Sequence, residues 1–94
     1  MGTDIRISPK LKGVEYIVSY NDVEEVHQLV EDAIRINTIV KSTTIDTFEL
    51  SINGGAFAVP TLPLDLSAND ELIWQIVFNS GETLGSLSVK AEKI

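Results

Sequence analysis

The second half of the chain alternates between apolar and polar residues, and this alternation limits the possible folds more than any other feature of the sequence. From residue 45 onward apolar residues recur at every second position, as in Phe48, Leu50 and Ile52. A period of two places such side chains on one face of a β-strand. Clusters of Gly, Asn, Asp and Ser separate the alternating segments and indicate turns. The sequence therefore predicts an antiparallel β-sheet with an apolar face.

The same rule predicts individual strands over residues 13–20, 34–42, 45–52, 56–60, 61–66, 71–78 and 83–92. Residues 71–78 are apolar on both faces, so we expect them to form a central strand with Trp74 in the core. Asn53-Gly54 is the sequence signal of a tight hairpin turn. Several short strands with frequent turns predict a mainly β fold, a small antiparallel Ig-like β-sandwich.

The segment between the first two predicted strands carries a different pattern. Its apolar residues recur at helical intervals of three and four residues: Val23, Val26, Val30 and Ile34. Asp22 with Glu25 three residues later resembles a capping box. These features predict one short amphipathic helix near residues 22–33. The alternative is an early strand, because the residues from Ile34 onward also alternate as a strand does.

Composition and length indicate one acidic globular domain. The chain has 94 residues, a net charge of −7 and 44% hydrophobic residues, which suffices for a modest core of marginal stability. We expect an extended arm over residues 1–13, with an edge strand around residues 5–8, and a single β-sandwich domain over residues 14–94. No apolar run approaches the roughly 20 residues of a membrane span, so we expect neither a signal peptide nor membrane insertion.

The residues that carry chemistry do not form a catalytic set. The chain has no Cys and a single histidine, His27. A nucleophile such as Ser80, Ser86 or Ser88 would need His27 as its base, and no nucleophile-elbow motif surrounds any serine. The acidic balance also argues against a nucleic-acid partner, which would require clustered Lys and Arg. We therefore predict a protein that is not an enzyme, needs no cofactor and binds no nucleic acid.

Two groups of residues offer metal ligands, and neither is a good site. His27 would share a helix face with Glu24 or Glu31, but zinc usually takes several nitrogen or sulfur ligands. A second group gathers oxygen ligands for calcium around one loop: Asp65, Asn69, Asp70 and Glu71. Its spacing is not that of an EF-hand, and Asx-rich turns form for backbone reasons alone. We therefore expect no metal.

Five motifs follow one another in residues 48–91: the NGG turn, the PTLPLDL entry, the polar SAND turn, the strand with Trp74 and the closing GSLSV strand. In these motifs the chain resembles the small Ig-like β-sandwich domains of tailed-bacteriophage virion proteins, such as head-decoration, head-fibre and tail accessory proteins. The resemblance implies a structural role in the virion, with the domain as a rigid body. We expect a homo-oligomer that docks to other structural proteins of a larger particle.

The least regular third of the sequence supplies the candidate interface. Tyr16 and Tyr20 share one face of a predicted strand, and a predicted helix face adds valines. The expected interface residues are Tyr16, Tyr20, Val23, Val26, Val30 and Phe57. The alternative function is a monomeric β-sandwich module that binds a glycan or surface ligand, with the two tyrosines and Phe57 as exposed rings. An oligomer in solution favours the structural role, and a stable monomer favours the ligand-binding module.

Overall fold

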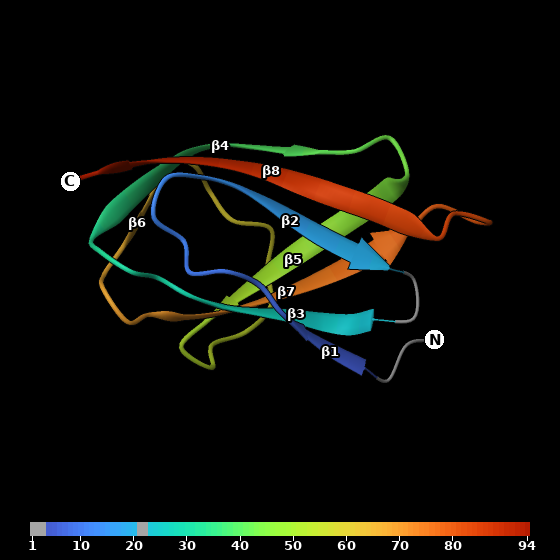
Figure 1. Cartoon of the computed structure of the whole chain (residues 1–94), viewed down its shortest axis with the longest axis horizontal. Coiled ribbons are helices and arrows are strands. Elements are labelled where there is room, and N and C mark those ends of the chain that lie inside the picture. The colour runs from blue at the N-terminus through green and yellow to red at the C-terminus, as the bar shows by residue number, and fades with distance from the viewer. Residues whose placement is uncertain (1–3, 21–22) are drawn as a thin grey trace.

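Two four-stranded β-sheets pack face to face in a computed structural model of the chain, which describes residues 4–20 and 23–94 (Figure 1). Sheet I contains, in spatial order, β1 (Asp4–Ile7), β3 (Val23–Leu29), β7 (Glu71–Phe78) and β5 (Ile45–Ile52). Sheet II contains β2 (Val14–Tyr20), β8 (Leu84–Lys93), β4 (Ile34–Lys41) and β6 (Leu64–Leu66). Among the strand pairs of the described residues, β1 and β3 run parallel and the others run antiparallel. The prediction of a mainly β, two-sheet fold is confirmed.

Consecutive strands never lie in the same sheet. All odd-numbered strands belong to sheet I and all even-numbered strands to sheet II, so each connection leads from one sheet to the other. Within each sheet the neighbours are therefore distant in sequence, as in the pairing of β2 with β8 (Figure 1). The expected central strand, β7, lies between β3 and β5.

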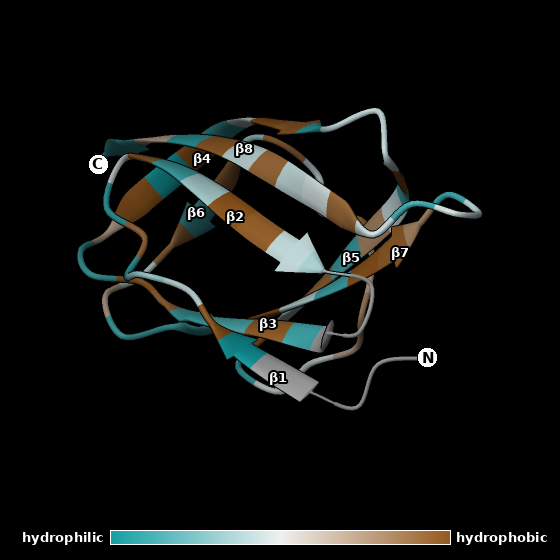
Figure 2. Cartoon of the chain, turned by 45° about the vertical axis from the view of Figure 1, so that its right-hand side comes forward, coloured by the Kyte–Doolittle hydropathy of each residue, from teal (hydrophilic) through white to brown (hydrophobic). Residues whose placement is uncertain are grey.

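The core lies between the two sheets and is built from the inward side chains of both. Figure 2 shows the apolar and polar residues alternating along the strands, as a period of two requires. Trp74 is fully buried, as predicted, and its ring lies 6.1 Å from the ring of Phe48. The other buried apolar residues are Leu11, Ile17, Val26, Val30, Ile34, Ile36, Ile45, Leu50, Leu66, Leu72, Leu87 and Val89.

The predicted helix near residues 22–33 is wrong, because the described residues 23–29 form β3 and no described residue is helical. Val26, Gln28 and Val30 point inward at every second position, with exposed fractions of 1%, 3% and 1%. The polar Gln28 interrupts the apolar alternation. The two valines on either side of it, Val26 and Val30, are four residues apart, which is also the spacing of residues on one face of a helix. Pairing with β1 on one side and β7 on the other determines the strand. The proposed cap at Asp22 lies outside the described residues.

The side chain of Gln28 points into the core and makes hydrogen bonds to two polar groups, of which the indole of Trp74 is buried. The indole Nε1 of Trp74 donates a hydrogen bond to Gln28 Oε1 at 3.2 Å. In turn, Gln28 Nε2 donates to the carbonyl oxygen of Pro9 at 2.9 Å. One side chain of β3 therefore connects the core tryptophan of β7 to the segment that follows β1, and each buried polar group in this chain of contacts has a partner.

The described part of the predicted arm packs along β3. β1 is an edge strand of sheet I, and after it the Leu11 N–H donates to the carbonyl of Leu29 at 2.8 Å. The Leu11 side chain is fully buried. The described residues form no helix that is long and apolar enough to cross a membrane.

The hairpin predicted at Asn53-Gly54 forms only in part. Both residues have positive φ angles, 51° and 78°, as a turn of this kind requires. The returning chain pairs with β5 only through a bridge between Leu50 and Ala58. The strands predicted over 56–60 and 61–66 are thus reduced to this bridge and to the short strand β6.

An exposed ion pair joins β6 to its neighbour β4. Arg35 Nε donates to Asp65 Oδ1 at 2.7 Å, and Arg35 Nη2 donates to Oδ2 at 3.2 Å. These hydrogen bonds, together with the positive charge of Arg35, hold the pKa of Asp65 below its usual value. The pair therefore stabilises the ionised form of Asp65 in the folded protein.

We expect Arg35→Gln to raise the pKa of Asp65 toward the ordinary aspartate value, as measured by NMR titration of the carboxyl carbon. Because the folded pKa of Asp65 is lowered, its contribution to stability is complete above the unfolded pKa of about 3.9 and is lost as the pH falls through the folded pKa. Lys41→Gln, on the same strand, is the control and should leave this pKa low. A pKa of Asp65 unchanged by Arg35→Gln would contradict the assignment.

Candidate functional site

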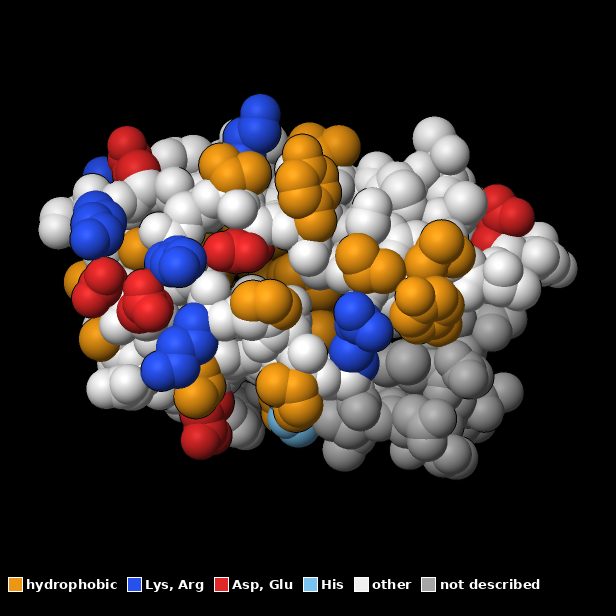
Figure 3. Space-filling view, viewed as in Figure 1, with side chains coloured by type: hydrophobic (Ala, Val, Ile, Leu, Met, Phe, Trp, Pro, Cys, Tyr) orange, Lys and Arg blue, Asp and Glu red, His pale blue; other side chains and the backbone are white. Residues whose placement is uncertain are grey.

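The outer face of sheet II carries a row of solvent-exposed apolar side chains. Tyr16 on β2 lies beside Ser88 on β8, which lies beside Val40 on β4, and Tyr20 lies beside Leu84. We call the exposed apolar residues of this face the apolar strip, and they are between 44% and 65% exposed: Val14, Tyr16, Tyr20, Val40 and Leu84. Figure 3 shows hydrophobic side chains gathered over β2 on the side turned to the viewer. Ser88 separates Val40 from Tyr16, so the apolar residues are gathered mainly on β2 and at its neighbour Leu84. Exposed apolar patches often mark an interaction site.

One edge of β2 pairs with β8, and the other edge, which we call the free edge, is not paired by any strand of the described chain. Figure 2 shows β2 as the outermost strand of sheet II, on the side of β1 and β3. The strand is seven residues long, with the sequence VEYIVSY. It contains no Lys, Arg or Pro, the residues that commonly prevent an edge strand from pairing with another chain.

The direction of the backbone groups on β2 follows from two hydrogen bonds beside it. Ala91 N–H donates to the Gly13 carbonyl at 3.1 Å, and Ser42 N–H donates to the Ser86 carbonyl at 2.9 Å. Residues of an antiparallel strand alternate between pointing these groups toward one neighbour and toward the other. With the observed register, the odd-numbered residues of β2 face β8. The even-numbered residues therefore direct their N–H and C=O groups to the free edge: Val14, Tyr16, Val18 and Tyr20.

The other three sheet edges carry features that limit pairing. β1 has four residues, among them Asp4 and Arg6, and β6 has three residues directly after Pro63. β5 is bridged at Leu50, where two backbone hydrogen bonds of 2.9 and 3.2 Å join it to Ala58. Short length, charge, proline and a covering segment are the common ways in which proteins protect edges. Within the described chain, β2 is the long edge strand with the least protection, because no segment covers it and Glu15 is its one charged residue.

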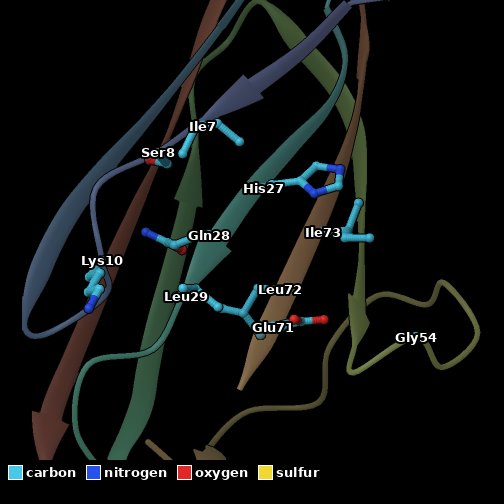
Figure 4. Close-up of a pocket in the computed structure, with 10 residues that line it drawn as sticks. All are labelled: Ile7, Ser8, Lys10, His27, Gln28, Leu29, Gly54, Glu71, Leu72 and Ile73. Carbon is cyan, nitrogen blue, oxygen red and sulfur yellow. The ribbon is translucent and has the colours of Figure 1, made fainter. Parts of the chain in front are cut away.

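A groove of about 450 Å³ lies on the outer face of sheet I. Its floor includes Leu29 and Ile73, from the neighbouring strands β3 and β7, and the loop with Gly54 borders it on one side. Ser8 and Lys10, on the segment after β1, border it on the other side (Figure 4). The groove is mainly apolar and has no aromatic ring other than the imidazole of His27.

The structure separates the predicted interface residues. Tyr16 and Tyr20 are exposed on one face of β2, and the guanidinium of Arg6 lies 5.6 Å from the ring centre of Tyr20. Val26 and Val30 are in the core, so they are unavailable to a partner of the folded domain. Phe57 is half-buried in the loop after β5, and the side chain of Val23 lies outside the description.

Sequence reasoning missed three members of the apolar strip: Val14, Val40 and Leu84. Val14 shares the alternation of Tyr16 and Tyr20, so that pattern signalled it. Val40 and Leu84 join the strip only through the order of the strands in sheet II, which no local pattern reveals.

The candidate catalytic and metal-binding residues are not brought together. His27 lies on the outer face of sheet I, whereas Ser86 and Ser88 lie on the opposite sheet. His27 Nε2 is 3.0 Å from Glu25 Oε1, and Glu31 is exposed beyond the end of β3. No three His, Asp or Glu side chains among residues 4–20 and 23–94 are grouped to hold a metal ion.

The calcium candidates serve the backbone and a neighbouring strand. Asp70 accepts hydrogen bonds from the Ser67 N–H at 2.8 Å and from Asn53 Nδ2 at 3.0 Å. Asp65 binds Arg35. Two of the three acidic side chains of the group, Asp65 and Asp70, are thus engaged in hydrogen bonds within the protein.

Comparison of the chain with protein-family models, curated proteins and solved structures finds no match. A function for this domain is therefore inferred from the two surfaces described above, the apolar strip with the free edge of β2 and the groove on sheet I.

Proposed function

We propose that this protein is a non-enzymatic structural module that associates with copies of itself. The observation that supports the proposal is the apolar strip, whose five residues are exposed on three neighbouring strands of sheet II. Burying apolar surface is favourable by about 25 cal/mol per Å². A domain of this size has a small core, so packing the β2 residues of the strip against a second copy adds apolar burial that the single chain cannot supply.

The larger assembly that we propose is a virion, in which the chain acts as an Ig-like decoration, fibre or other accessory component. Support for this part comes from the resemblance of residues 48–91 to domains of tailed-bacteriophage virion proteins. The rigid two-sheet body and an exposed apolar surface suit a component that docks to other structural proteins. Virus particles purified from a culture that expresses the chain should then contain it, as detected by mass spectrometry, and its absence from the particles would refute the virion role.

We expect the purified full chain to form oligomers whose mass rises with concentration above the monomer mass of 10.3 kDa. Size-exclusion chromatography with light scattering, run from micromolar to millimolar concentration, measures this mass. The range matters because a dissociation constant of about 1 mM corresponds to a binding free energy of only about −4 kcal/mol. A mass of one chain at every concentration would refute self-association.

A second candidate function is a monomeric module that binds a surface ligand, and the groove on sheet I favours it. Its volume of about 450 Å³ is within the range of small-molecule sites, and its apolar floor would bind the apolar part of a ligand. Glycan stacking is less suited to this groove, because Tyr16 and Tyr20 lie on the other sheet. A monomer whose His27, Leu29 and Ile73 NMR signals shift on addition of a ligand would favour this function over the structural one.

A further inference from the structure

We propose that β2 of one copy pairs with β2 of a second copy in antiparallel orientation, so that the two copies of sheet II form one continuous sheet. The proposal rests on the proposed self-association and names the contact through which it occurs. Three observations support it: the unpaired backbone groups of β2, the symmetry of its sequence, and the protection of the other sheet edges.

The backbone of β2 requires a strand as its partner. The N–H and C=O groups of Val14, Tyr16, Val18 and Tyr20 point to the free edge, as shown by the hydrogen bonds on both sides of β8. None of their N–H groups has a hydrogen-bond partner within the described chain. An added strand satisfies such a row of groups through regular main-chain hydrogen bonds.

The sequence of β2 is complementary to itself when a two-fold axis passes through Ile17. Tyr16 then lies opposite Val18 of the second copy, and Val14 lies opposite Tyr20 of the second copy. Aromatic and β-branched residues directly opposite each other are favourable cross-strand pairs. The pairs formed in this way are the hydrogen-bonded ones, because the same four residues direct their backbone groups outward.

No charges of the same sign meet in this register. Glu15, the only charged residue of β2, lies opposite Ser19 of the second copy. The outer faces of the two strands also merge, so the apolar strip continues from one copy into the other. The proposed contact between two β2 strands therefore involves the same face of sheet II as the apolar strip, which supports the proposed function.

The pairing closes after two copies. A two-fold contact uses the same edge on both copies, so it leaves no free β2 edge to recruit a third. The remaining edges resist pairing through the features of β1, β5 and β6 described above. We therefore favour a second copy over an unrelated peptide as the partner of β2. A second copy supplies a strand of complementary sequence, and the resulting two-fold dimer is closed.

A charge-exchange experiment tests the pairing and its register. Tyr16→Lys/Val18→Lys places like charges directly opposite each other across the two-fold axis, and Tyr16→Glu/Val18→Glu does the same with negative charges. Each double variant alone should dimerise at least about tenfold more weakly than the unaltered chain, a change of about 1.4 kcal/mol. Mixing the two should restore a heterodimer, because each Lys then faces a Glu. Analytical ultracentrifugation measures all three states.

Val40→Lys is the matched control, since Val40 belongs to the apolar strip but lies on β4, away from the free edge. We expect this variant to dimerise nearly as well as the unaltered chain. Oligomers that persist in both double variants, or that are lost only in Val40→Lys, would overturn the edge pairing and leave self-association intact. A monomeric unaltered chain would refute the proposed function itself.

A second measurement does not depend on added charge. The chain has no Cys, so Tyr16→Cys and Val18→Cys each introduce a single thiol. In the proposed register residue 16 faces residue 18 of the second copy, at a distance that a disulfide can span. Oxidising a mixture of the two variants should crosslink one copy of each, and neither variant should crosslink efficiently alone. Equal crosslinking of each variant with itself would overturn the register.

Discussion

Gln28→Leu is expected to lower the free energy of unfolding by about 1–3 kcal/mol, because it removes the hydrogen-bond partner of two polar groups, one of which is buried. The two groups are the Trp74 Nε1–H and the Pro9 carbonyl, which Gln28 binds at 3.2 and 2.9 Å. Domains of this kind have a total stability of about 5–15 kcal/mol, so the loss is a large share of it. Urea denaturation followed by tryptophan fluorescence measures the change.

Gln75→Leu is the matched control for this prediction. Gln75 is half-buried on the outer side of β7, next to Trp74 in sequence, and makes no side-chain hydrogen bond within the described chain. The same chemical change there should alter the stability by no more than about 0.5 kcal/mol. Equal effects of the two substitutions would show that the hydrogen bonds of Gln28 do not stabilise the core.

Gly85→Ala is expected to destabilise the domain by about 1–3 kcal/mol through overpacking. A methyl group at this buried position on β8 would lie 2.6 Å from Ile45 Cγ1 and 3.0 Å from Phe78 Cε2. Atoms of Ile45 and Phe78 must move to admit it, and both side chains belong to the opposite sheet. Thermal unfolding followed by circular dichroism measures the loss.

Gly13→Ala is the control, because no atom lies within 4 Å of the position that its methyl group would take. The added methyl group reduces the freedom of the unfolded chain, so Gly13→Ala should be neutral or should stabilise by up to about 1 kcal/mol. If Gly85→Ala also proved neutral, the two sheets would have to be less tightly packed at this point than the distances indicate.

The sequence predicts the fold well in those segments where the local pattern of apolar and polar residues is enough to assign a strand. Residues 14–20, 45–52 and 71–78 each form the expected strand, and an apolar residue recurs at every second position along most of each segment. The turn residues that flank these segments leave little choice of boundary, although β5 also has an irregularity in its register between Ile45 and Thr47.

The errors arise where a distant contact overrides the local pattern. The strand β3 was mistaken for a helix because the polar Gln28 interrupts its apolar alternation. Gln28 points inward because its side chain accepts a hydrogen bond from Trp74, which is distant in sequence. In the same way, Ala58 and Leu64 pair with residues that are distant in sequence, on β5 and β4 respectively. Pro60 and Pro63 limit how far this pairing extends.

The candidate site was predictable only in part for a similar reason. The exposed tyrosines of β2 follow from their alternation, but which face of the strand is exposed depends on the inward position of Ile17 and Ser19. That β2 is an edge strand follows from the order of strands in sheet II, which the connections between the two sheets determine. A single sequence contains no direct record of that order.

The passage of every connection from one sheet to the other has a consequence for the order of events in folding. No two consecutive strands can form a hairpin within a sheet, so each native pairing must close a long loop, and β2 has no partner in its own sheet until β8 has been synthesised. Folds dominated by such non-local pairings fold in milliseconds to seconds rather than microseconds. During synthesis β1 can pair with β3 early, whereas β2 stays without a partner in its own sheet until the ten residues of β8 have been made.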